Sequence, residues 1–421
     1  MNLPLIAPYI RLLTGNRQYR WLWFSQVVSL TGDWFNLIAT TTLVAQLSRS
    51  GLAISGIFLA RLLPPFLLGP VVGVVADRFD RKKILIASDL LRMAVVLGFL
   101  RVRSESDLWL LYGLILLQLS ISAFFEPTRS ALMPAIVPRK DLVTANALDS
   151  TTWSTMLAVG AALGGLATAT LGISAAFIID ALTFAASAWC VWHLHPPRED
   201  FSVTAGQSSF TNYVDGLRYL WHRPHTLALT LVKAAAALSF GAIDIVQVEF
   251  AEKIFPVGNN SSGTLGIIYT AIGIGTGLAP LLAQKFTGER QNAMRRGITV
   301  AFVMSAIGFF GVAWSPTLWI LLLATVIRTG GSGIAWVYSS ALLQMRVPSA
   351  FRGRVFAFDL AAFTLASGAS TFWGGYALDR LGLAPREVAF WCGVVGIVTL
   401  TVWAAYHHFQ QNATAARPTA S

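Results

Sequence analysis

Four stretches of this chain contain no charged residue, and each is longer than the roughly 20 residues that a helix needs to cross a lipid bilayer. They cover residues 150–179, 254–284, 297–327 and 388–416. Turn signals inside two of them, Leu171-Gly172 and Ser315-Pro316, divide the apolar run into two segments joined by a tight connection. The pattern therefore predicts a polytopic membrane protein rather than a water-soluble domain.

The composition agrees with this prediction. Of 421 residues, 55% are hydrophobic and only 12% are charged, whereas soluble proteins have about 25% charged residues. Segments long enough to span a membrane cover 21–47, 52–76, 83–100, 108–127, 146–169, 173–194, 226–250, 263–284, 297–313, 318–340, 355–378 and 387–408. We therefore predict an all-α integral membrane fold with twelve transmembrane helices.

The net charge of +11 follows from topology rather than from a polyanionic partner. If the N-terminus lies in the cytoplasm, most of the 31 Lys and Arg residues fall in segments on the cytoplasmic side. We therefore expect both termini to be cytoplasmic, as in a multi-pass protein of a bacterial inner membrane. The expected surroundings are the lipid bilayer, with no nucleic acid bound.

The two halves of the chain resemble one another at a constant offset. Leu108-Trp109 recurs as Leu318-Trp319, and Val137-Pro138 recurs as Val347-Pro348. A repeat of this kind is typical of secondary transporters built from two six-helix halves. We predict an N-terminal bundle over 1–195, a cytoplasmic linker over 196–225, a C-terminal bundle over 226–408 and a cytoplasmic tail over 409–421.

A short charged loop lies between the second and third predicted spans, where it cannot lie in hydrocarbon. It resembles the signature loop of the major facilitator superfamily, whose pattern is roughly G-x-L-A-D-R-x-G-R-[RK]-[RK]. The residues that fit this pattern are Gly73, Ala76, Asp77, Arg78, Arg81, Lys82 and Lys83. Asp80 stands where the pattern has Gly. The alternative is an ordinary basic cytoplasmic loop.

The resemblance implies an inner gate that closes while the cavity faces outward. Asp77 would face the positive N-terminus of a neighbouring helix, and Asp359 could pair with Arg78 or Arg81. Asp149, near the start of helix 5, could meet one of three bases before helix 11: Arg346, Arg352 and Arg354. The alternative is that Asp149 and Asp359 only stabilise the N-termini of their helices.

Several further motifs resemble the macrolide-efflux type of drug:proton antiporters, a branch that includes siderophore exporters. They include Gly32-Asp33, Arg61-Leu-Leu-Pro64, Asp89-x-x-Arg92, Pro127-Thr-Arg129, Asp180-Ala181 and Arg352-Gly353-Arg354. The residues Gly160, Gly164 and Gly165 resemble the antiporter motif G-P-x-x-G-G, with Ala161 in place of Pro. These glycines could instead serve ordinary close packing of helices.

Ionisable residues inside a membrane are costly and are candidates for function. Asp33, Lys233, Asp244 and Arg328 lie within the predicted helices 1, 7 and 10, which line the central cavity in the superfamily. We expect Asp33 first, and Asp244 second, to carry the coupling proton. Lys233 and Arg328 would be counter-ions or contacts for an acidic substrate group. The alternative is that these carboxylates and bases form permanent ion pairs.

The aromatic residues Trp34, Phe124 and Trp336 fall on presumed cavity helices and would suit a lipophilic substrate. They could equally face lipid. No phosphate-binding loop, metal-ligand cluster or nucleophile motif is present, so we expect neither an enzyme nor a cofactor.

The sequence therefore predicts a monomeric secondary transporter that exports a drug, macrolide or siderophore-like molecule in exchange for protons. Alternatives are a lysophospholipid translocator of the same fold and a membrane-embedded acyltransferase.

Overall fold

The computed structural model describes residues 7–48, 50–196, 218–257, 262–288 and 290–415. Helices dominate these ranges, and no strand occurs within them. The predicted linker over 196–225 lies mostly outside the described residues. The predicted tail begins within a helix that continues to Ala415, and its last residues, 416–421, are not described.

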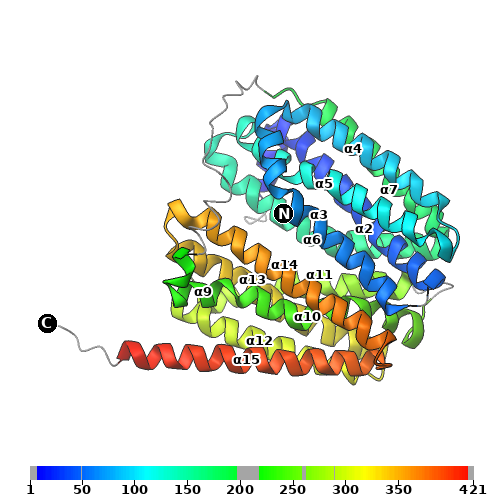
Figure 1. Cartoon of the computed structure of the whole chain (residues 1–421). Coiled ribbons are helices and arrows are strands. Elements are labelled where there is room, and N and C mark those ends of the chain that lie inside the picture. The colour runs from blue at the N-terminus through cyan, green and yellow to red at the C-terminus, as the bar shows by residue number, and fades with distance from the viewer. Residues whose placement is uncertain (1–6, 49, 197–217, 258–261, 289, 416–421) are drawn as a thin grey trace. The chain divides into compact units, whose positions relative to one another are not determined.

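The described helices form two groups, and within each group they follow one another along the chain (Figure 1). The first group comprises α1 (Ala7–Gly15), α2 (Arg17–Ser48), α3 (Gly51–Arg78), α4 (Arg81–Gly98), α5 (Leu108–Ile136), α6 (Leu142–Leu171) and α7 (Ile173–Trp192). The second group comprises α9 (Pro224–Thr230), α10 (Val232–Glu249) with a π-helical turn (Phe250–Ile254), α11 (Ser262–Thr287), α12 (Gln291–Ala313), α13 (Leu318–Arg346), α14 (Ser349–Asp379) and α15 (Pro385–Ala415).

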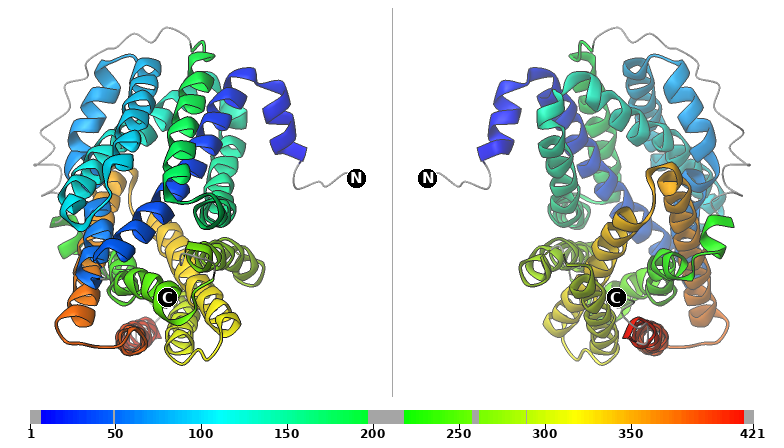
Figure 2. Two further views of the ribbon diagram at one scale, coloured as in Figure 1. Left: turned by 90° about the vertical axis from the view of Figure 1, so that its right-hand side faces the viewer. Right: turned by 90° about the vertical axis from the view of Figure 1, so that its left-hand side faces the viewer.

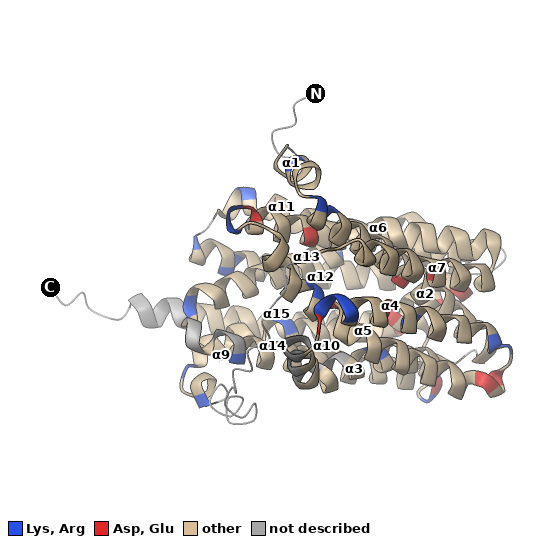
Figure 3. Cartoon of the chain, turned by 90° about the horizontal axis from the view of Figure 1, so that it is seen from above, with Lys and Arg blue, Asp and Glu red and all other residues tan. Residues whose placement is uncertain are grey.

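Within the described residues, nine helical segments are long and apolar enough to cross a membrane. The helices α2, α3 and α4 are not among them, although α4, the shortest of the three, has 18 residues. Asp89 and Arg92 within α4, and the bases at its start, lower its hydropathy. The membrane character of the fold is thus confirmed, whereas the count of twelve spans stays a prediction. Figure 3 shows that long stretches of the helices carry neither Lys, Arg, Asp nor Glu.

The chain divides into two compact units. The first contains Met1–Gly206 and Ala251–Thr270, and the second contains Gln207–Phe250 and Ala271–Ser421. In the first unit α2 packs against α6 and α7, while α4 packs against α5 and α7. In the second unit α10 packs against α14 and α15, and α12 packs against α13 and α15.

The short helix α1 was not predicted, and it turns away from the start of α2 (Figure 2). Asn16 forms the corner, because its Oδ1 accepts a hydrogen bond from the Tyr19 backbone amide at 3.0 Å. Its Nδ2 donates to the carbonyl of Ile136 at 2.8 Å, which fixes the corner to the end of α5. Leu12 and Tyr19 are then buried in one apolar cluster with Met133.

Most helices in the structure are longer than the spans predicted from hydropathy, and this changes where the acids lie. Helix α6 begins at Leu142 rather than near Asn146, and α14 begins at Ser349 rather than near Val355. Asp149 therefore lies in the second turn of its helix, and Asp359 lies in the third. Because the field of a helix terminus decays within the first turn, the helix-terminus explanation for these acids is wrong.

Candidate functional site

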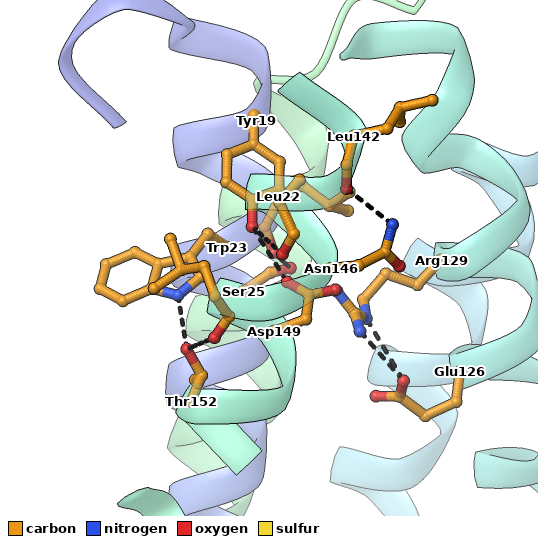
Figure 4. Close-up of polar contacts among 12 residues, drawn as sticks. Tyr19, Leu22, Trp23, Ser25, Glu126, Arg129, Leu142, Asn146, Asp149 and Thr152 are labelled. Carbon is orange, nitrogen blue, oxygen red and sulfur yellow. Dashed lines mark hydrogen bonds and ion pairs between the residues drawn. The ribbon is translucent and has the colours of Figure 1, made fainter. Parts of the chain in front are cut away.

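Asp149 joins three helices of the first unit through hydrogen bonds (Figure 4). Its Oδ2 accepts from Arg129 Nη1 of α5 at 2.8 Å, and its Oδ1 accepts from the Tyr19 hydroxyl of α2 at 3.1 Å. Glu126, one turn before Arg129, accepts from Nη2 of the same guanidinium at 3.3 Å. The carboxylate of Asp149 thus has a charged partner and a neutral donor, so this network ties α2, α5 and α6 together.

The predicted partners of Asp149 belong to the second unit, but its observed partner lies in its own unit. The reason is that α5 continues past Pro127 to Ile136 and so carries Arg129 alongside α6. A gating role for Asp149 stays a prediction. The same holds for four other predicted gate residues whose side chains are not described: Gly73, Asp77, Arg78 and Arg352.

Two further predicted gate residues have described contacts. The Nη1 of Arg81 donates to the carbonyl of Ala131 on α5 at 3.2 Å. The guanidinium of Arg354 lies 5.2 Å from the ring centroid of Phe351, which is close enough for a cation–π interaction. Both contacts lie within a single unit, and a gating role for these residues also stays a prediction.

Asp33 lies half-buried on α2. Among the described residues it makes no hydrogen bond and no ion pair. The positive charges that act on it most strongly are those of Arg92 on α4 and Arg61 on α3. Asp33 is therefore a carboxyl group within the first bundle that is influenced by two cations but held by neither.

The guanidinium of Arg92 is held by several contacts. Its Nη2 forms an ion pair with Asp89 on the same helix, as their spacing predicts. The other oxygen of Asp89 accepts from the hydroxyl of Ser187 on α7 at 2.7 Å. The guanidinium also lies between two rings, 4.5 Å from the centroid of Phe125 and 4.3 Å from that of Phe184. This arrangement indicates a structural role for Asp89 and Arg92, which tie α4 to α5 and α7.

Lys233 forms the central ion pair of the second unit. Its Nζ lies 2.5 Å from Oδ2 of Asp359 on α14, and both side chains are at most 5% exposed. The same ammonium lies 4.5 Å from the ring centroid of Trp336 on α13 and 5.6 Å from that of Phe356. Lys233 is thus a counter-ion, but its partner is Asp359, which we had expected to pair with Arg78 or Arg81.

The carboxylates Asp149 and Asp359 are related by the repeat offset that matches Leu108 with Leu318. Each forms a buried ion pair within its own unit, but the two cations come from helices that are not equivalent. Arg129 lies on α5, just after the end of the fourth predicted span, whereas Lys233 lies on the first predicted span of the second half. The repeat has therefore kept the acid and changed the helix that supplies its cation.

Asp244 is the carboxyl group of the second unit that resembles Asp33. It is half-buried on α10, and among the described residues it makes neither a hydrogen bond nor an ion pair. The charge of Arg328, which is 1% exposed, acts on it most strongly. The Arg328 guanidinium itself lies 5.3 Å from the ring centroid of Phe309. A permanent ion pair of Asp244 with Lys233 or Arg328 is not observed between these described side chains.

The three motif glycines lie where α6 meets other helices of the first unit. A Cβ atom at Gly164 would lie 3.1 Å from Cα of Phe35, and one at Gly165 would lie 2.7 Å from Cα of Gly266. At Gly160 it would lie 2.8 Å from the Trp34 ring. The glycines therefore allow the backbone of α6 to approach α2 and α11 closely. A role in antiport stays a prediction.

The three predicted substrate-contacting aromatics differ in their surroundings. Trp34 packs over Gly160 and lies 5.6 Å from Tyr269, measured between ring centroids. Trp336 is 44% exposed and contacts Lys233. Phe124 is half-buried. Trp34 thus takes part in helix packing, whereas Trp336 offers an exposed aromatic surface beside a buried ion pair.

The sequence analysis missed four polar residues of the first unit as site residues: Tyr19, Asn36, Arg129 and Asp180. Arg129 and Asp180 did lie within the motifs quoted for the resemblance, and each is a charge in a mainly apolar helix. A charge in a mainly apolar helix is visible in the sequence, and it was sufficient to predict both as site residues. Tyr19 and Asn36 carry no such signal, because a neutral polar residue in a membrane helix is common.

Comparisons with known proteins point to one family. The chain is 29% identical over 396 residues to the uncharacterized MFS-type transporter YfiS of Bacillus subtilis (strain 168), covering 89% of this chain and 91% of YfiS. It is 25% identical to the multidrug efflux pump Tap of Mycolicibacterium fortuitum, covering 79% of this chain and 82% of Tap.

The fold is that of solved transporters of the same superfamily. The crystal structure of the nucleoside transporter NupG matches with a TM-score of 0.74 and 13% identity, covering 92% of this chain and 98% of NupG. A family model described as "Transmembrane secretion effector" matches residues 12–414. The chain therefore belongs to the transmembrane secretion effector family of multi-pass membrane transporters, within the major facilitator superfamily.

Proposed function

We propose that this protein exports amphipathic or lipophilic small molecules in exchange for protons, by alternating access of two helical bundles. The observation that carries this proposal is Asp33, a half-buried carboxyl group without a bonded partner among the described residues. Charged groups at membrane depth are costly, so they persist where function requires them. We place the protein in a bacterial inner membrane with both termini in the cytoplasm.

Proton coupling needs a group whose protonation changes as its surroundings change. A carboxylate in a fixed ion pair does not suit this purpose, because its partner stabilises one protonation state throughout. Asp89, Asp149 and Asp359 are fixed in this way, whereas Asp33 and Asp244 are not. We therefore assign the coupling proton to Asp33 and a supporting role to Asp244.

The class of substrate is inferred from one relative and from the surroundings of Trp336. The relative Tap is named a multidrug efflux pump. In this chain the exposed ring of Trp336 and the neighbouring cation Lys233 offer an apolar surface next to a charge. Such a combination suits molecules that are apolar over most of their surface and carry one polar group.

The substitution Asp33→Asn tests the assignment. In proteoliposomes with an acidic lumen, proton efflux should drive uptake of ethidium by the wild type. We expect Asp33→Asn to lower this uptake by about tenfold or more, because a carboxamide cannot carry the proton. The measurement is dye fluorescence against time, with and without a protonophore.

A matched control is Glu105→Gln, which neutralises an exposed acid outside the bundle core and should leave uptake unchanged. Uptake by Asp33→Asn at the wild-type rate would exclude Asp33 as the coupling acid. In a parallel experiment with fluorescent lysophosphatidylethanolamine, gradient-driven flipping without dye uptake would favour a lipid translocator instead.

A further inference from the structure

Among the described acids of the first unit that form no ion pair, Asp180 on α7 is the most deeply buried. Its exposure is 0%, and neither carboxyl oxygen has a hydrogen-bond partner. Helix α2 covers it closely, since a Cβ atom at Gly32 would lie 2.5 Å from Asp180 Oδ1 and 2.0 Å from Thr183 Oγ1. The glycine thus leaves just enough space for the carboxyl group.

The charged groups around Asp180 do not neutralise it. From α2 the charge that acts on it is that of Asp33, and the cations that act on it are Arg92 from α4 and Arg61 from α3. None of these forms an ion pair with Asp180 in the described structure. Arg92 is engaged by Asp89, as described above.

The other elements packed against α7 add no further partner. The only charged residue of α6 is Asp149, which is bound to Arg129. The turn before α5 contributes Arg101, whose side chain is exposed. The side-chain amide of Asn36 on α2 is close enough to favour an ionised Asp180, but the two side chains form no hydrogen bond of normal length. An ionised Asp180 would therefore be a buried charge with no ion pair and no short hydrogen bond, which is unfavourable in a membrane.

A protonated Asp180 fits these surroundings. It is neutral and has one O–H donor to offer. The buried amide of Asn36 lies one turn after Gly32 on the same face of α2, and both its side-chain oxygen and its nitrogen lack partners. Asp33 lies three residues before Asn36 and is half-buried rather than fully buried. Asp33 is thus the more accessible of the two acids, and it follows directly the glycine that lies against Asp180.

We propose that Asp180 is a second proton-binding site, which stores a proton behind Asp33 and exchanges it through that residue. In the exchange, the Asp180 carboxyl group gives its proton to the Asp33 carboxylate, so the negative charge moves from Asp33 to Asp180. The positive charges of Arg61 and Arg92 act on both acids, which lowers the cost of the transient charge on Asp180 without removing it. This inference deepens the proposed function, because it adds a residue to the proton path.

Infrared spectroscopy of the full-length protein in lipid nanodiscs tests the proposal without any substrate. The wild type should show the carbonyl stretch of a protonated carboxylic acid at neutral pH. The difference between wild type and Asp180→Asn should contain this band, whereas the difference between wild type and Asp89→Asn should not. A wild type without the band, or the same band in Asp180→Asn, would overturn the proposal.

A second variant tests the route and does not depend on the folding of Asp180→Asn. In Asp33→Asn the band should remain. After transfer into D₂O, however, the exchange of the carboxyl proton for deuterium, seen as a shift of the band, should be at least several-fold slower than in the wild type. Loss of the band, or exchange at the wild-type rate, would contradict the route through Asp33.

Transport measurements separate this inference from the proposed function. In proteoliposomes that hold ethidium at the same concentration inside and outside, Asp180→Asn should still exchange dye across the membrane. The variant should lose the uptake of ethidium that is driven by the proton gradient. If the wild type shows gradient-driven uptake but the infrared difference is absent, only the inference about Asp180 fails. If the band is present but no dye is transported, the assignment of drug export fails while Asp180 remains a proton site.

Discussion

Lys233→Met is expected to lower the free energy of unfolding by about 3–5 kcal/mol, because it leaves the Asp359 carboxylate buried without its cation. The two side chains are almost fully buried, and no other cation pairs with Asp359 among the described residues. Methionine keeps the length of the lysine side chain, so packing against Trp336 changes little. The measurement is unfolding of the purified protein in mixed micelles, followed by tryptophan fluorescence.

The double variant Lys233→Met/Asp359→Leu distinguishes a lost ion pair from a lost contact. Removing both charges leaves no uncompensated carboxylate, so most of the stability should return. Additive losses from the two single substitutions would contradict this explanation. In that case the contribution of each residue would come from its packing rather than from the charge on its partner.

The same double variant also tests the predicted gate. If Asp359 only ties α14 to α10, a stable double variant should keep the wild-type maximal rate of ethidium transport, and only the apparent affinity should change, because Lys233 lies beside Trp336. If Asp359 must also exchange partners during transport, the double variant should be stable and inactive. Stability and activity then respond differently to the same pair of substitutions.

The ion pairs show how much the sequence can predict. Asp149, Lys233, Asp244, Arg328 and Asp359 were selected correctly as charges near or within membrane helices, because a charge in an apolar segment is visible without a structure. Their partners were not predictable. A partner depends on where each helix begins and how it is rotated, and hydropathy placed the starts of α6 and α14 several residues too late.

The fold was easier to predict than the site for a related reason. Apolar segments and a repeat require only composition and spacing, and both are preserved when single contacts change. The burial of Asp180 requires that Gly32 of α2 faces α7. A glycine next to an acid in the sequence, Gly32-Asp33, does not reveal which other helix lies against it.

Gly165, one of the three motif glycines, lies where α6 and α11 approach most closely at a motif position. Gly165→Leu is expected to lower the free energy of unfolding by about 3 kcal/mol, the upper part of the usual range for an overpacked site. A Cβ atom at this position would already lie 2.7 Å from Gly266 Cα and 2.9 Å from the carbonyl oxygen of Ser262. Both are backbone atoms, so α6 and α11 must separate to admit any side chain. Thermal unfolding of the purified variant measures the loss.

The control for Gly165→Leu is Gly113→Leu on α5, where a Cβ atom would meet nothing within 4 Å. Leucine favours a helix over glycine by up to about 1 kcal/mol, so this variant should be as stable as the wild type or more so. Equal losses at both positions would show that helix propensity or insertion, rather than close approach to α11, determines the result. A stable Gly165→Ala variant that no longer transports ethidium would instead show that the contact between α6 and α11 must slide during transport, since a methyl group tolerated at rest would then block only the movement.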